Sequence, residues 1–310
     1  MKSIAIWYKP KTNTGDFVDE VELHFNLWKL PTGSKGHVRF LDIGIKLKNT
    51  TNIDELKLYF PTKIRRDDFE DIVDKFIGKP DLVSAIFNEN YKVISDAASK
   101  SFQINDSTNK LIFNIYKTTK EDIKREEKYS GTIFSILVPK QDETIYFRFR
   151  IKGTFINSLI STSSPTNAIL ESAFSEVEMI DFRVNEIRDL DQSLLEEIQK
   201  NKKLKIGKQH FFFICSNEEE VIGSHQPHIS CRNLENYRWN DYVGLADIKD
   251  QIFLAYHWKD KEIENSNILI KTKYEKNNWR TITKYILLAL LIGMSLELLG
   301  NWVYDLTKCK

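Results

Sequence analysis

An apolar run near the C-terminus constrains this 310-residue chain more than any other feature of its sequence. The run extends from Tyr285 to Leu296 and, after one acidic residue, resumes to Val303, which makes nineteen residues in all. A helix of about 20 apolar residues crosses the hydrocarbon core of a bilayer. Aromatic side chains, which favour membrane interfaces, flank the run at Trp279, Tyr285, Trp302 and Tyr304. The sequence predicts a transmembrane helix within residues 279–306, and the alternative is a buried helix in a large soluble core.

Positive charge is concentrated on the N-terminal side of the apolar run. The basic residues before it are Lys271, Lys273, Lys276, Arg280 and Lys284, and those after it are Lys308 and Lys310. Because basic residues stay on the cytoplasmic side of a membrane, we expect residues 1–270 to form a body in the cytoplasm. The three cysteines provide no disulfide framework, which is typical of a reducing compartment. The start of the chain lacks a secretory signal pattern, so the C-terminal helix is expected to act as a tail anchor.

Glu297 interrupts the apolar run and is the most informative single residue. A carboxylate at membrane depth costs about 2.5 kcal/mol or more, so it is expected to face a partner helix, a wet cavity or a cation. Ala289, Gly293, Glu297 and Asn301 recur every four residues and therefore share one helix face. Small residues on that face allow a second helix to approach closely. We predict that several copies associate along this face around a pore, and the alternative is that Glu297 reaches the nearby interface.

The composition is that of a folded protein without a dominant charge. Apolar residues make up 41% of the chain and charged residues 29%, which leaves enough apolar sequence for a sizeable core. The 45 Lys and Arg residues nearly balance the 44 Asp and Glu residues, for a net charge of +1. This balance argues against bulk duplex nucleic-acid binding by the whole surface, although it leaves room for a local basic groove.

Strand patterns dominate the body. Apolar and polar residues alternate over 21–28 and again over 38–47, which predicts a hairpin or meander with one buried face. Further strands are predicted over 56–60, 102–104, 111–116, 132–138, 144–151, 177–184, 211–215 and 252–258. Helices are predicted from the capping pair Asp67 and Asp68 to Ile77, over 81–87 and over 189–200, and the charged stretch 119–128 is predicted as a loop or short helix. The fold class is therefore α+β, with a β-rich antiparallel body, a few short helices and one C-terminal transmembrane helix.

The stretch 153–167 is rich in Ser and Thr and is the best candidate for a domain boundary. It divides the body into a β-rich N-terminal half, residues 1–152, and a C-terminal half, residues 153–270. Apolar residues within the stretch also fit a long packed loop, in which case the two halves form one domain.

The strand 144–151 carries the first group of candidate ligand-binding residues. Tyr146, Arg148 and Arg150 share one of its faces. Such a face could receive an anionic ligand. The solvated face of an antiparallel sheet has the same pattern, and we favour that interpretation.

Two further groups of residues are candidates for binding an anionic ligand. The first is a lysine cluster that includes Lys202, Lys203 and Lys205. It is a candidate for binding phosphates or acidic headgroups. The alternative is that these cations only stabilise the C-terminus of the preceding helix. The second group combines guanidinium and aromatic side chains and includes Arg232, Arg238 and Trp239. Such a mixture can stack bases and hold phosphates, or it can simply pack a loop.

His225, His228 and Cys231 carry zinc-ligating atoms, and two residues separate each from the next. This is not the spacing of a recognised zinc finger, and a structural zinc site requires four ligands, so we predict no metal and treat these residues as weak candidates. The sequence has no phosphate-binding loop, no nucleophile elbow and no His-Glu-x-x-His motif. We predict no catalytic residue, no cofactor and no enzyme, and a tethered hydrolase with a dispersed site is a further alternative.

The layout of the chain, with Glu297 and Asn301 on the Ala289 and Gly293 face of a terminal helix, resembles that of bacterial antiphage membrane effectors, such as the Hailong-type effectors. The resemblance covers the layout and the last thirty residues. It implies a homo-oligomer among the lipids of the bacterial inner membrane. The cytosolic body would sense a nucleotide or oligonucleotide, and the helices would permeabilise the membrane. The alternative is a non-enzymatic, tail-anchored scaffold or binding module, in which the helix is only an anchor.

Overall fold

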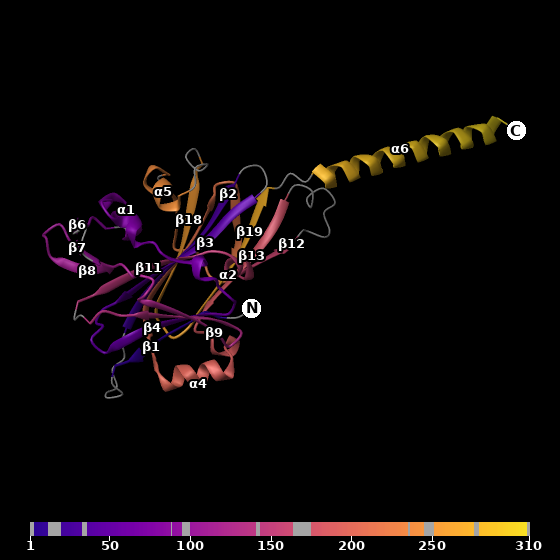
Figure 1. Cartoon of the computed structure of the whole chain (residues 1–310). Helices are drawn as coiled ribbons and strands as arrows, with labels where there is room; N and C mark the ends of the chain where they lie inside the picture. The colour runs from indigo at the N-terminus through magenta and orange to yellow at the C-terminus, as the bar shows by residue number, and fades with distance from the viewer. Residues whose placement is uncertain are drawn as a thin grey trace.

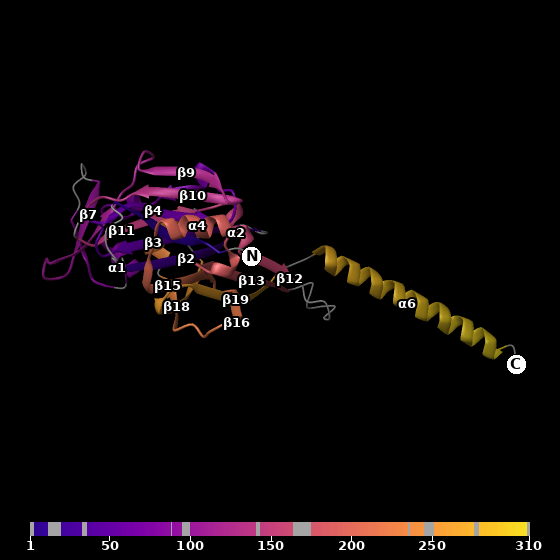
Figure 2. The same cartoon turned by 90° about the horizontal axis from the view of Figure 1, so that it is seen from below.

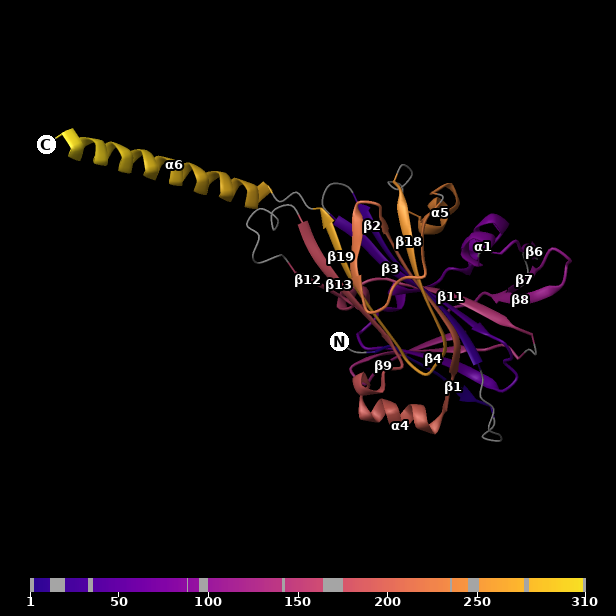
Figure 3. The same ribbon diagram turned by 180° about the vertical axis from the view of Figure 1, so that it is seen from behind.

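A β-rich body and one long C-terminal helix make up the molecule (Figure 1). The computed structural model describes residues 3–11, 20–32, 36–87, 89–94, 100–140, 143–163, 175–234, 236–244, 251–275 and 279–308. The helix α6 (Trp279–Lys308) extends away from the body in all three views (Figures 1, 2 and 3). The predicted fold class is confirmed, because the described residues form a β-rich body with short helices and a C-terminal helix able to span a membrane.

The largest sheet has ten strands and runs through the middle of the body. Its strands are β2 (Glu20–Thr32), β3 (Gly36–Leu47), β5 (Phe69–Asp71), β6 (Lys92–Ile94), β7 (Ser101–Asn105), β8 (Leu111–Tyr116), β11 (Ile145–Ile151), β15 (Lys205–Ser216), β17 (Ser230–Leu234) and β18 (Phe253–Ile263). They lie in the order β17-β18-β15-β2-β3-β11-β8-β7-β6, with β5 also paired to β11. The pairs β2–β15 and β8–β11 are parallel. The first of these parallel pairs joins strands from opposite halves of the chain.

Two smaller sheets complete the body. The five-stranded sheet has the order β14-β1-β4-β10-β9 and comprises β1 (Ala5–Pro10), β4 (Ile53–Phe60), β9 (Ile123–Lys128), β10 (Gly131–Leu137) and β14 (Lys202–Lys203). The four-stranded sheet has the order β12-β13-β19-β16 and comprises β12 (Ile160–Ser163), β13 (Ser175–Val184), β16 (Glu219–Ser224) and β19 (Ser266–Glu275). The last strand, β19, precedes the long helix in the chain.

Short helices connect the strands of the body. The α-helices of the body are α1 (Pro80–Phe87), α2 (Thr154–Ser158), α4 (Gln192–Lys200) and α5 (Asn236–Val243), and the 3-10 helices are η1 (Arg66–Asp68), η2 (Val73–Phe76) and η3 (Ile187–Asp189). Asp191 caps α4 by accepting a hydrogen bond from the backbone N–H of Ser193 at 2.9 Å. The apolar face of α4 carries Leu194 and Ile198, which pack on the five-stranded sheet.

The largest hydrophobic core lies between the ten-stranded sheet and the two smaller sheets. Alternate residues of β2, such as Leu23 and Phe25, point into it and meet Leu58 of β4 and Phe182 of β13. The rings of Phe25 and Phe182 lie 4.8 Å apart in an edge-to-face arrangement, which aromatic pairs favour. This core explains the strict alternation of apolar residues in β2, because every second side chain is buried in it.

The opposite face of the ten-stranded sheet is also buried. Trp28 and Phe40 on this face pack against Phe76 of η2 and against Trp239 and Tyr242 of α5. The prediction of a single buried face for 21–28 and 38–47 is therefore wrong. The reason is tertiary, since helices from distant parts of the chain cover a strand face that carries polar as well as apolar residues.

Two local predictions are also wrong. Asp67 and Asp68 lie in η1 rather than capping a long helix, and Phe69 begins the strand β5. The ring of Phe69 stacks on those of Phe134 and Phe149, at centroid distances of 4.0 and 4.9 Å. Burial of this ring against neighbouring strands outweighs the local helix pattern. The stretch 119–128 contains the strand β9, whose charged residues occupy the edge of the five-stranded sheet, where charge opposes edge-to-edge aggregation.

The stretch 153–163 is packed into the body. Phe155 and Ile156 of α2 are buried in the largest core, and residues 160–163 form the edge strand β12. Residues 164–167 of the predicted boundary lie outside the described residues. The pairs β2–β15 and β1–β14 join residues 1–152 to residues 153–270 within shared sheets.

Gly44 of β3 leaves room for the hydroxyl group of Tyr146 on the neighbouring strand. A Cβ atom at position 44 would overlap this hydroxyl oxygen and lie 2.7 Å from the ring carbon that carries it. We expect Gly44→Ala to lower the free energy of unfolding by about 1–3 kcal/mol, as overpacking does. Urea unfolding with Gly223→Ala as control checks this, because the nearest atom to a Cβ there is 3.9 Å away. Equal stability of the two variants would contradict the prediction.

Candidate functional site

The helix α6 exposes large apolar side chains along its length. Its segment Ile282–Tyr304 comprises 23 residues and is long and apolar enough to cross a membrane, and none of its most apolar window is buried against the body. Large side chains are exposed all round the helix, for example Leu290 at 59% and Leu298 at 69%. The run predicted from the sequence, Tyr285–Val303, lies inside this segment.

The face predicted to associate is exposed along its whole length. Ala289, Gly293, Glu297 and Asn301 are all exposed, and no atom lies within 4 Å of a Cβ atom added at Gly293. A second helix therefore has room to approach this face. Association and a pore along it stay predictions.

Arg148 and Arg150 of β11 lie inside the body rather than on a solvated or ligand-binding surface. The two side chains are 0% and 2% exposed. Arg150 makes a bidentate ion pair with Asp42 of β3, with Nε–Oδ1 and Nη2–Oδ2 distances of 2.7 and 3.1 Å. Tyr242 of α5 donates its hydroxyl to the same carboxylate at 2.6 Å. The preferred interpretation of a solvated face is thus wrong, because α5 covers it.

Arg148 completes this buried network. Its guanidinium donates to the hydroxyl oxygens of Tyr242 and Tyr146 at 2.9 and 2.7 Å and to the amide oxygen of Asn26 at 3.1 Å. All three guanidinium nitrogens therefore have acceptors within the protein. Burial raises the pKa of the Tyr242 phenol, which stays neutral and donates to Asp42. The network fastens α5 to the sheet, and because Arg148 is fully buried, its guanidinium is not presented to an external anion.

Trp239 and Arg232 do not lie together on an open surface. Trp239 is 4% exposed and packs at 5.4 Å from the ring of Trp28, as a core residue. Arg232 is exposed on β17, and its guanidinium donates to the carbonyl oxygen of Ala85 at 3.3 Å. The side chain of Arg238 lies outside the described residues.

The lysine cluster borders a cavity. Lys202 and Lys203 form β14, and Lys205 begins β15. Lys203 and Lys205 line a cavity of about 430 Å³ together with seven apolar residues, two acids and two amides: Ile6, Ile187, Leu190, Leu195, Ile198, Leu204, Ile263, Glu262, Glu264, Asn185 and Asn265. Ligand pockets of proteins have volumes of about 300–1,000 Å³ and are mainly apolar with few polar groups. This cavity can therefore hold the apolar part of a small ligand near two ammonium groups.

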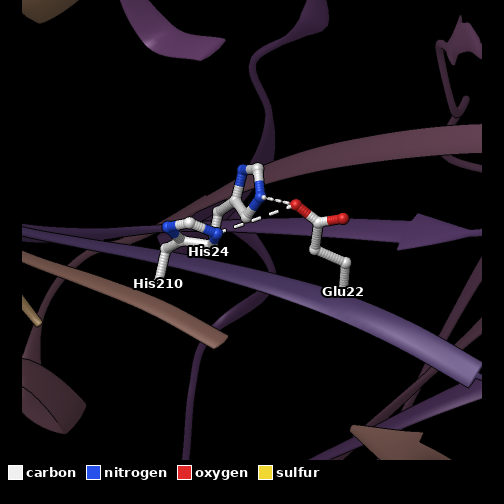
Figure 4. A group of neighbouring side chains, drawn as sticks. All are labelled: Glu22, His24 and His210. Atoms are coloured by element: carbon white, nitrogen blue, oxygen red, sulfur yellow. Dashed lines mark hydrogen bonds and ion pairs between the residues drawn. The ribbon is translucent and has the colours of Figure 1, made fainter. Parts of the chain in front are cut away.

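Glu22 and His24 of β2 meet His210 of β15 at a part-buried site (Figure 4). The Nε2 atoms of His24 and His210 lie 3.1 and 3.8 Å from the same oxygen of Glu22, Oε1. Sequence patterns did not reveal this group because its members lie in apolar strands far apart in the chain. The only local signal of the group is the spacing of Glu22 and His24, which are two residues apart in β2. The pairing of β2 with β15 brings the third residue, His210, beside them.

The protonation states of this cluster follow from its environment. Burial lowers the pKa of His24, and it lowers the pKa of His210 to about 3, so both imidazoles are neutral near pH 7. Burial alone would raise the pKa of Glu22. The hydrogen bond from His24 and the nearby positive charges outweigh burial and bring this pKa to about 2. The cluster thus presents one carboxylate and two neutral imidazoles.

The weak metal candidates of the sequence do not form such a cluster. Cys231 and His228 are exposed, and the ring of His228 packs edge-on against Tyr256 at 5.2 Å. His225 accepts a hydrogen bond from the backbone of Leu269 at 3.3 Å. Over the ranges that the structure describes, His225, His228 and Cys231 belong to no group of three converging ligands.

Comparisons with known proteins identify no family for this chain. The chain matches no protein-family model, and it has no significant match among curated proteins.

Proposed function

We propose that this chain is a tail-anchored membrane effector whose C-terminal helices associate and permeabilise the membrane when the body receives a signal. The observation that carries the proposal is the surface of α6. The segment Ile282–Tyr304 is apolar all round, but one face combines Glu297 and Asn301 with the small residues Ala289 and Gly293.

The exposed apolar area of the helix supports membrane insertion. An apolar surface that surrounds a helix of this length is unfavourable in water, and lipid tails cover all its sides at once. Because the helix follows the body in the chain, its insertion leaves residues 1–270 on one side of the membrane. The basic residues that precede the helix favour the cytoplasmic side, here that of a bacterial inner membrane.

The position of Glu297 supports self-association. It lies seven residues before Tyr304, which corresponds to about 10 Å along a helix. A carboxylate at this depth contacts lipid unless a neighbouring helix or water covers it. Close packing at Gly293 and Ala289 brings helices together, and the carboxylates then line a shared polar axis through which ions pass.

The signal would reach the body at the cavity beside Lys203 and Lys205. The apolar walls suit the ring of a small ligand. The two ammonium groups, which line the cavity together with the carboxylates of Glu262 and Glu264, suit an anionic group, as in a nucleotide or oligonucleotide end. In a bacterial cell, membrane permeabilisation on such a signal serves antiphage defence, as the resemblance to antiphage membrane effectors implies. A ligand that binds one arrangement of the body more tightly than another would shift the population toward the first. That shift would change how the helices pack.

Expression of the full chain tests this function against a version that ends before Trp279. We expect the full chain to resist alkaline carbonate extraction and to dissipate the membrane potential of a bacterial host, measured with a potential-sensitive dye. The truncated chain is expected to be soluble and to leave the potential unchanged. Extraction of the full chain into the soluble fraction would refute membrane anchoring.

A third chain carries an unrelated apolar helix in place of Tyr285–Val303. It distinguishes the effector function from the scaffold alternative. The effector function requires the native helix, so the exchanged chain should stay in the membrane without depolarising it. If the exchanged chain retains the biological activity of the native one, the helix is only an anchor and the scaffold alternative is correct.

A further inference from the structure

The parallel pairing of β2 and β15 creates a cluster of metal-ligating atoms. In the register of this pair, His24 lies directly opposite His210. Glu22 is two residues before His24 and therefore lies on the same face of β2. Figure 4 shows the imidazoles of both histidines directed toward the carboxylate of Glu22. One ligand atom from each residue lies within 4.8 Å of the other two.

We propose that Glu22, His24 and His210 bind a divalent transition-metal ion of the zinc class, in a three-ligand site with one open coordination position. Bonds of about 2.1 Å to a tetrahedral zinc ion place the ligand atoms roughly 3.4 Å from each other. The two distances to Glu22 Oε1, 3.1 and 3.8 Å, lie on either side of this value. Small rotations of the side chains therefore bring the three atoms to one ion.

A second histidine orients His210 for this role. The Nδ1 atom of His210 is hydrogen-bonded to Nε2 of His257 at 3.0 Å, which leaves Nε2 of His210 for the metal. The ring of His257 in turn stacks on Phe212 with centroids 4.1 Å apart. Metal-ligating imidazoles commonly have such a partner on the second ring nitrogen, which fixes the tautomer and ring orientation. The cluster thus has both the ligands and a support for one of them.

The charges around the cluster set its affinity. The ammonium group of Lys46 lies 4.0 Å from the other carboxylate oxygen of Glu22, Oε2, and leaves Oε1 to the imidazoles. The charges of Lys208 and of the buried Arg148 also act on Glu22 and His24, respectively. These positive groups oppose a cation, so we expect weaker binding than at a closed zinc site with thiolate ligands.

The site is accessible to an ion from solvent. The side chains of Glu22 and His210 are 20% and 18% exposed, whereas that of His24 is 10% exposed. Two imidazoles and one carboxylate are a donor set of open zinc sites, in which water occupies the fourth position. The proposal is independent of the membrane helix, because all its residues lie in the ten-stranded sheet.

Zinc titration of the purified full chain in detergent tests the site. Isothermal titration calorimetry with Zn²⁺, and cobalt absorption spectra with Co²⁺, are compared between the native chain and Glu22→Gln and His210→Ala. Each substitution removes a ligand from a part-exposed position, and Glu22→Gln keeps the shape of the side chain. We expect a loss of affinity of at least about 100-fold, and a loss of about 10- to 100-fold for His257→Ala.

His228→Ala serves as the control, because it removes a histidine outside the cluster. It is expected to bind Zn²⁺ with native affinity. The proposal is overturned if the native chain binds no Zn²⁺, or if Glu22→Gln and His210→Ala bind it as tightly as the native chain. Melting curves recorded without metal verify that the variants are folded, so that a loss of binding reports on the ligands.

Discussion

Replacing Glu297 with alanine is expected to abolish most of the depolarisation that the full chain causes. The substitution leaves an apolar helix that inserts more favourably, since it removes a cost of about 2.5 kcal/mol or more. It also removes the carboxylate from the proposed helix interface, where Asn301 stays. A polar interaction between membrane helices contributes about 1–2 kcal/mol, so its removal weakens the association constant roughly tenfold. Membrane potential and cross-linking of membrane fractions measure the two effects.

Ser295→Ala is the matched control for this variant. Ser295 is two residues from Glu297 and so lies on nearly the opposite side of the helix. Its hydroxyl donates to the carbonyl oxygen of Leu291 at 2.8 Å, so it needs no partner from another chain. We expect native depolarisation from this control. If the Glu297→Ala chain depolarises cells as the native chain does, Glu297 has no part in permeabilisation.

Asp42→Ala is expected to destabilise the body by about 3–5 kcal/mol, the cost of leaving one partner of a buried ion pair unpaired. Asp42 is 0% exposed and is the carboxylate that neutralises Arg150. It also accepts hydrogen bonds from the Tyr242 hydroxyl and, at 3.1 Å, from the indole of Trp28. The substitution leaves three buried donor groups without this acceptor. Urea unfolding of the detergent-solubilised chain, followed by tryptophan fluorescence, measures the change.

Glu70→Ala provides the comparison for Asp42→Ala. Glu70 pairs with Lys152 at 3.0 Å, but both side chains are nearly half exposed, at 46% and 48%. Exposed pairs contribute about 0–1 kcal/mol, so this variant should unfold near the native midpoint. A double variant with Arg150→Met should lose less than the sum of the single changes, because no buried charge is left unpaired. A similar small loss for Glu70→Ala and Asp42→Ala would show that the buried network does not hold the sheet and α5 together.

Local sequence patterns determined the long helix and most of the strands. The helix depends on a nearly continuous apolar composition, which requires no knowledge of the rest of the chain. Strands such as β10 and β11 are rich in β-branched and aromatic residues, and their positions agree closely with the predicted segments 132–138 and 144–151. At β5 and β9, pairing with a neighbouring strand overrides a local pattern that favours helix or loop. The strands β1, β6, β12, β14, β16, β17 and β19 lie outside the predicted segments.

The sites depended on contacts between distant residues. Arg148 and Arg150 alternate with apolar residues as on a solvated sheet, and only the docking of α5 shows that their face is buried. Lys203 and Lys205 were identified as a cationic cluster, but the neighbouring cavity requires α4 and the end of β18.

The long apolar helix of this protein was thus determined by the sequence alone, because hydrophobicity over one helix is a local property. The buried arginine network and the Glu22, His24 and His210 cluster were decided only by the tertiary structure. Each group joins residues of elements far apart in the chain, and strand order and register are set by the burial of whole sheet faces.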